Sequence, residues 1–81
     1  MSAFPSPAHD KIALHLDYLA ESASLIEGFA QRAQANAALG SSCGLRGDFS
    51  QMFRILRDAV DVVQKLEVAE AEIQKIRAEA A

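Results

Sequence analysis

Three side chains in this sequence are of the types used in nucleophilic catalysis: Cys43, His9 and His15. A catalytic cysteine needs a base within hydrogen-bond reach to accept its proton. If the chain folds as a helical hairpin that closes near Cys43, both histidines lie at the end opposite this cysteine, so one chain cannot bring them together. Only an antiparallel dimer that brings His9 or His15 of one chain near Cys43 of the other would make such a pair, and we therefore predict no catalytic residues and no enzyme.

Other chemical sites lack some of their parts. One cysteine and two histidines cannot supply a structural zinc site, and the spacing of His9 and His15 does not place them on adjacent turns of a helix. No glycine-rich phosphate loop is present. Glu67 and Glu70 form a carboxylate pair without an accompanying nucleophile, and we interpret them as a polar break in an apolar helix face. The sequence therefore predicts no metal and no cofactor.

The elements that position these residues are two helices of similar length. Ser6 and Pro7 fit an N-cap followed by a proline at the first helical position, and Gly40 fits a C-terminal stop. Asp48 and Gln51, three residues apart, fit a capping box. We expect a disordered lead-in over residues 1–6 and a single domain over residues 7–81, with a helix from about 7 to 39, a loop from about 40 to 47 and a helix from about 48 to 80.

Heptad-like spacing of apolar residues predicts that these helices pack as an antiparallel hairpin. The fold class is therefore all-α. The predicted hairpin core comprises Ile12, Leu16, Leu19, Ile26, Phe49, Met52, Phe53, Leu56, Val60, Val63 and Leu66. Facing-residue arithmetic also places His15 near Glu70, as a polar pair.

Each helix carries more apolar surface than one neighbouring helix covers, because a single neighbour covers only a narrow seam. A second stripe is predicted to form an interface, and its residues are Leu14, Tyr18, Leu25, Phe29, Ile55, Val62, Ile73 and Ile76. The simplest way to bury this stripe is contact with a second copy of the chain, which gives a homodimeric four-helix bundle. A different protein as cover is the alternative.

Charge and hydropathy exclude two classes of binding partner. The formal net charge is −3, with 8 basic and 11 acidic side chains, which argues against nucleic-acid binding. No apolar run has the length of a membrane span, and the first residues lack the features of a signal peptide. We expect a cytoplasmic protein that binds neither nucleic acid nor membrane.

The segment Leu19–Ile26 (LAESASLI), with the alanines spaced after it, resembles short two-helix domains of unknown function from pseudomonads. By its layout, with Arg46, Gly47 and Asp48 at the turn, the chain is also similar to the small hairpin co-chaperones of type III secretion. In those proteins two helices hold a secreted subunit and a larger chaperone. The resemblance implies a bacterial protein, and a similarity at the level of the fold does not by itself assign a function.

These observations favour a small, non-enzymatic regulatory or adaptor protein that binds itself and another protein through apolar helix faces. The alternative is a subunit of an obligate hetero-complex, a chaperone or inhibitor related to phage or secretion. An enzyme that uses Cys43 and His15 across a dimer ranks last.

Overall fold

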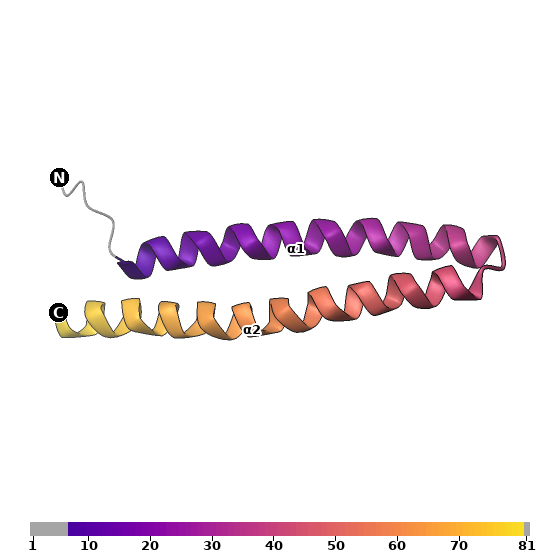
Figure 1. Cartoon of the computed structure of the whole chain (residues 1–81). Helices are drawn as coiled ribbons and strands as arrows, with labels where there is room; N and C mark the ends of the chain where they lie inside the picture. Colours follow the sequence, from indigo (N-terminus) through magenta and orange to yellow (C-terminus); the bar gives the residue numbers. More distant parts are fainter. Residues whose placement is uncertain (1–6, 81) are drawn as a thin grey trace.

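The computed structural model describes residues 7–80, which form two α-helices joined by a tight turn (Figure 1). Helix α1 spans Pro7–Ala38 and helix α2 spans Ser42–Ala80. They run side by side in opposite directions, so the predicted all-α helical hairpin is confirmed. The predicted disordered lead-in, residues 1–6, lies outside the described residues.

The turn is only three residues long, and its hydrogen bonds end one helix and start the next. Gly40 has a φ of 72°, and its N–H donates to the Ala37 carbonyl at 3.1 Å. The Ser41 N–H donates to the Asn36 carbonyl at 2.8 Å. These two bonds and the left-handed glycine make a Schellman motif, so the stop predicted at Gly40 is confirmed.

Ser41 also begins the second helix. Its Oγ accepts a hydrogen bond from the Gly44 N–H at 3.3 Å, and its carbonyl accepts one from the Leu45 N–H at 3.0 Å. Both bonds are those of an N-cap residue. The prediction of a loop over residues 40–47 and of a helix starting at Asp48 was therefore wrong, because Ser41 caps α2 two turns earlier.

Two glycines inside the first turns of α2 had suggested a loop, but the packed helix tolerates them. A glycine costs about 1 kcal/mol relative to alanine in a helix, which tertiary packing can offset. Gly44 has a packing reason as well, because a Cβ there would lie 2.8 Å from the side chain of Asn36 on α1. Gly44 therefore lets the two helices approach closely beside the turn.

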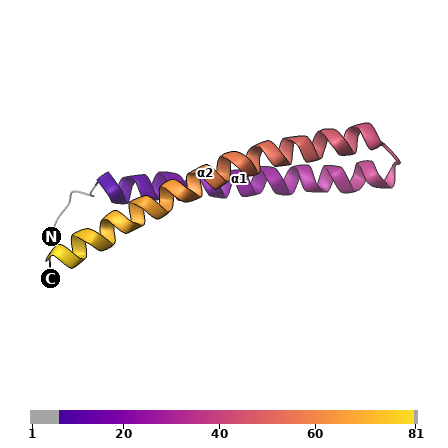
Figure 2. The ribbon, with the colours of Figure 1, turned by 90° about the horizontal axis from the view of Figure 1, so that it is seen from below.

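The seam between the helices follows a strict alternation of three and four residues. On α1 the half-buried or buried seam residues are Ile12, His15, Leu19, Ser22, Ile26, Phe29, Ala33 and Asn36. On α2 they are Leu45, Asp48, Met52, Ile55, Ala59, Val62, Leu66, Ala69 and Ile73. In the view turned by 90° the helices cross at a shallow angle (Figure 2), as heptad-spaced seams do.

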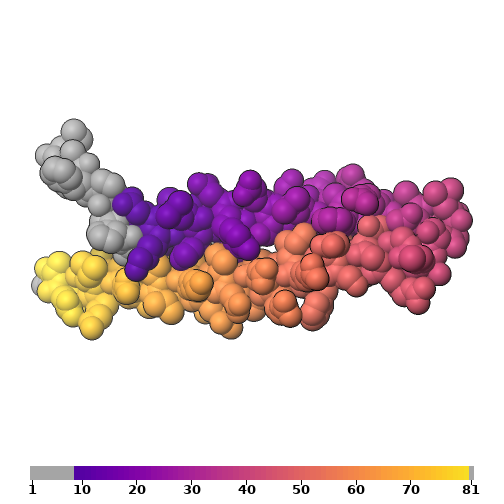
Figure 3. All heavy atoms as spheres, viewed as in Figure 1, coloured from indigo at the N-terminus to yellow at the C-terminus, as the bar shows by residue number. Residues whose placement is uncertain are grey.

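The hairpin is a narrow bar (Figure 3). It measures 60 × 21 × 14 Å, and its radius of gyration is 18.4 Å, against about 12 Å for a compact chain of this length. Within residues 9–80 the only buried residues are Ser22, Ala33, Asp48, Ala59 and Ala69. No large apolar side chain in that range is fully buried, so one hairpin encloses only a thin core.

The turn geometry predicts opposite effects for two Gly→Ala substitutions. Gly40→Ala puts a Cβ on a left-handed residue and should lower the free energy of unfolding by about 1 kcal/mol. Gly47→Ala, at an open helical position with nothing within 4 Å of the added Cβ, should raise it by about 0.5–1 kcal/mol. Thermal unfolding at equal protein concentration measures both. A stabilising Gly40→Ala would contradict the Schellman turn.

Candidate interaction surface

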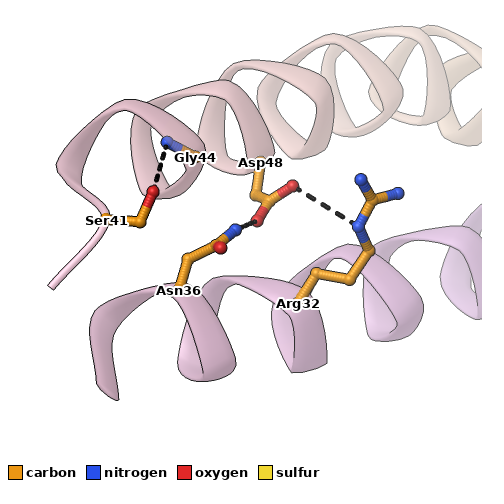
Figure 4. A network of polar contacts seen from close by, with 5 residues as sticks. All are labelled: Arg32, Asn36, Ser41, Gly44 and Asp48. Atoms are coloured by element: carbon orange, nitrogen blue, oxygen red, sulfur yellow. Dashed lines mark hydrogen bonds and ion pairs between the residues drawn. The ribbon is translucent and has the colours of Figure 1, made fainter. Parts of the chain in front are cut away.

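A small polar network ties the two helices together beside the turn (Figure 4). Asp48 is 4% exposed, and its Oδ2 accepts a hydrogen bond from Asn36 Nδ2 at 2.7 Å. Its other oxygen, Oδ1, lies 3.8 Å from Arg32 Nε. The guanidinium carbon of Arg32 sits 5.3 Å from the centre of the Phe29 ring, which braces the cation. A buried carboxylate is thus paired with an amide and a cation, as burial requires.

This network was not predicted from the sequence, although the spacing contains a signal for it. Asn36 continues the three-four alternation of the α1 seam, and Asp48 does the same on α2. Both were passed over because they are polar. Ser22 is a similar case: it is 5% exposed, and its hydroxyl donates to the Tyr18 carbonyl at 2.9 Å, a bond within its own helix.

Both phenylalanines of α2 lie outside the seam, in a row with Leu56, Val60 and Val63. We call them the outer stripe, and their exposed fractions are 58% for Phe49, 65% for Phe53, 54% for Leu56, 47% for Val60 and 39% for Val63. They also alternate by four and three residues, so they form a second continuous row beside the seam. The hairpin therefore packs inward a row that mixes medium and large apolar residues with Asp48, Ala59 and Ala69, and leaves the row with both phenylalanines of α2 in water.

Helix α1 presents small residues on the same side of the hairpin. A groove beside the turn is lined by Ala30, Ala33 and Ala37 of α1 together with Phe49 and Met52 of α2. A second groove extends over Phe53 and Leu56, where Arg46, Arg54 and Arg57 also line it. This face is therefore a shallow apolar trough in the half of the molecule near the turn, with cationic side chains among its lining residues.

The predicted hairpin core is confirmed for Ile12, Leu19, Ile26, Met52 and Leu66, which lie half-buried in the seam. It was wrong for the exposed residues, which are Leu16, Phe49, Phe53, Leu56, Val60 and Val63. The physical reason is that α2 carries two adjacent heptad rows and α1 can cover only one. The three-residue turn fixes which row faces α1, and it selects the row that contains Asp48.

Half of the predicted interface residues are exposed, and the other half belong to the hairpin seam. Leu14, Tyr18, Leu25 and Ile76 are exposed, as an interface outside the hairpin requires. Phe29, Ile55, Val62 and Ile73 instead lie half-buried in the hairpin seam, so they are not free to contact another chain. On α2 the prediction therefore exchanged most of the inner row with the outer row, and only Met52 and Leu66 were correctly placed in the core.

The expected pair of His15 and Glu70 does not form. His15 is half-buried and lines a groove at the open end with Lys11, Asp61, Lys65 and Glu72. The seam residue at that level is Ala69. Glu70 is one position further along, which turns its side chain by about 100°, and it is exposed. Glu67 and Glu70 thus follow the outer stripe and do not interrupt the seam.

Cys43 is exposed in the first turn of α2, and His15 lies 25 residues before Gly40 on α1, roughly 37 Å along the helix axis. Within one chain the two cannot meet. Across residues 9–80 no group of three or more His, Cys, Asp or Glu side chains is placed to hold a metal ion. Neither described helix is long and apolar enough to cross a membrane.

Comparison with known proteins returned no match among family models, curated proteins or solved structures.

The polar network predicts a measurable contribution to stability. Asp48→Ala leaves the half-buried Asn36 amide without its acceptor and should lower the free energy of unfolding by about 1–3 kcal/mol in urea denaturation. Asp58→Ala, at an exposed position of the same helix, should change it by less than about 0.5 kcal/mol. Replacing both Asn36 and Asp48 with Leu should recover most of the loss. Equal stability of Asp48→Ala and the wild type would refute the role of the network.

Proposed function

We propose that this chain is a small, non-enzymatic binding protein that works as a homodimer, with the trough around the outer stripe as the dimer interface. The observation that carries the proposal is the exposure of Phe49, Phe53 and Leu56, each more than half exposed. A row of large apolar side chains at heptad spacing is typical of a helix face that packs against another helix. Association of two hairpins through this face would make a four-helix bundle.

The accessible surface area of the chain is large enough for an interface with a second hairpin. The chain exposes 6281 Å², whereas a compact monomer of 8.7 kDa exposes about 4,700 Å². The difference is about 1,600 Å², and a standard protein–protein interface takes about 800 Å² from each partner. Pairing of two copies would therefore remove a large part of the excess, as oligomerisation does for other small domains without disulfide or metal.

A second copy is favoured over an unrelated cover by the shape of the stripe. The row is graded in size over two heptads, with Phe49 and Phe53 at one end and Val60 and Val63 at the other, so an antiparallel two-fold axis sets large side chains against medium ones. A regulatory or adaptor role needs a further surface outside the dimer. Leu14, Tyr18 and Leu25 on α1 are exposed and lie on the flank away from the trough, and we assign contact with another protein to them.

The dimer is tested with two leucines that share the same exposed fraction. Leu56 and Leu25 are each 54% exposed, but only Leu56 lies in the outer stripe. Light scattering should give a wild-type mass of about 17 kDa, twice that of the chain. Leu56→Glu should raise the dissociation constant roughly 100-fold or more, because the variant buries a charge at the centre of the interface.

Leu25→Glu is the matched control and should leave the dimer intact. Far-UV circular dichroism checks that both variants remain helical. A wild-type chain that is monomeric at all concentrations would contradict the homodimer and favour the hetero-complex subunit. Dissociation by Leu25→Glu and not by Leu56→Glu would move the interface to the opposite flank.

A further inference from the structure

We infer that the two hairpins associate antiparallel, with their turns at opposite ends and a two-fold axis beside Leu56. This inference rests on the proposed homodimer and assigns its orientation and register. The alternative is a dimer with both turns at the same end. The distribution of charge and one ion pair across the interface favour the antiparallel arrangement, and the position of the outer stripe fixes its register.

The charges of the chain are divided unequally along the bar. The half nearer the turn, residues 24–57, carries four basic and two acidic side chains, a net charge of +2. The open half, residues 7–23 and 58–80, carries four basic and nine acidic side chains, a net charge of −5. Turns at the same end would stack like charge on like charge. Turns at opposite ends set the positive half of each chain against the negative half of its partner.

The outer stripe fixes the register of this arrangement. It runs from Phe49 to Val63, and its middle residue is Leu56. When the stripe packs against itself antiparallel, Phe49 lies at the level of the partner's Val63, and Leu56 lies beside the partner's Leu56. A shift by one heptad would leave a large side chain at each end of the stripe in water, at a cost in buried apolar surface.

The residues that flank the stripe are complementary in this register. Arg46 precedes the stripe by about one helical turn, and Glu67 follows it by about one turn. Both continue the three-four alternation of the stripe, so they lie on the same face of α2. Across the two-fold axis Arg46 is brought to the level of the partner's Glu67, and the symmetry repeats this pair at the other end of the interface.

This ion pair can only be intermolecular. Within one chain Arg46 and Glu67 are 21 residues apart on a continuous helix, which separates them by about 32 Å along the axis. In a dimer with turns at the same end, Arg46 of both chains would lie near the turns and Glu67 far from them. If the effects of substitutions at Arg46 and Glu67 on the dimer dissociation constant depend on each other, the two hairpins are therefore antiparallel.

The native cysteine measures the orientation. Cys43 is exposed near the turn and is the only cysteine in the chain, so one spin label per chain needs no mutation. Cys43 is 13 residues from Leu56, which predicts a label separation of about 40 Å in the antiparallel dimer. Turns at the same end would bring the labels within roughly 20 Å, the width of a four-helix bundle. Pulsed electron spin resonance distinguishes the two distances.

Charge reversal provides the second test. Arg46→Glu and Glu67→Arg should each raise the dimer dissociation constant roughly tenfold, because each places like charges opposite one another at both ends of the interface. The variant with both changes should return to near the wild-type value. Lys65→Glu is the matched control, since it makes the same change of charge at an exposed position of α2 that lines neither groove of the trough, and it should have a smaller effect.

The outcomes separate this inference from the proposed function. A monomeric mass in light scattering overturns the homodimer and the orientation together. A dimeric mass with labels within roughly 20 Å keeps the homodimer and overturns the antiparallel arrangement. A long label distance without recovery in the double variant overturns the register centred on Leu56. A long distance with recovery supports both the orientation and the register.

Discussion

The structure depends on one geometric constraint: a single straight helix can cover only one heptad row of its neighbour. Helix α2 has two such rows side by side, one through Asp48 and Ile55 and the other through Phe49 and Leu56. The short turn at Gly40 and Ser41 determines which of them faces α1. The thin core and the exposed trough both follow from that choice.

The two rows of α2 differ in chemistry, and the difference indicates what each row does. The inner row contains Asp48, Ala59 and Ala69, which allow close approach but bury little apolar surface. Asp48 pairs with Asn36 instead of packing against an apolar group. A polar pair of this kind costs stability relative to an apolar pair, and its best-attested benefit is a fixed register. The hairpin thus specifies how the helices align, and we propose that association supplies the apolar burial.

The sequence was sufficient for the fold class and for the end of the first helix. Pro7 and Gly40 are strong local signals, because each restricts or permits a backbone conformation that few other residues do. The start of α2 was missed because Gly44 and Gly47 are typical of loops, whereas the cap that decides the matter is a single serine. A serine that caps a helix and a serine in a flexible loop look the same in the sequence. Only the hydrogen bond that its hydroxyl makes distinguishes the two.

The exchange of the two rows on α2 has a different origin. Hydrophobicity alone predicts that the larger side chains, Phe49 and Phe53, face inward, and in a one-domain globular protein that expectation is usually sound. It fails here, because the row with both phenylalanines is exposed, and an exposed apolar row of this kind is typical of a surface that contacts another chain. The exposure of this row is itself the clue to function that the sequence could not separate from an ordinary core.

The central claim, that a second copy covers the outer stripe, is tested most directly by isotope-filtered nuclear Overhauser spectroscopy on a mixture of labelled and unlabelled chains. The antiparallel dimer predicts intermolecular cross-peaks from the methyl groups of Val60 and Val63 to the rings of Phe53 and Phe49. Intermolecular cross-peaks that are confined to Leu14 and Leu25, or that are absent at concentrations where the chain is fully folded, would contradict it.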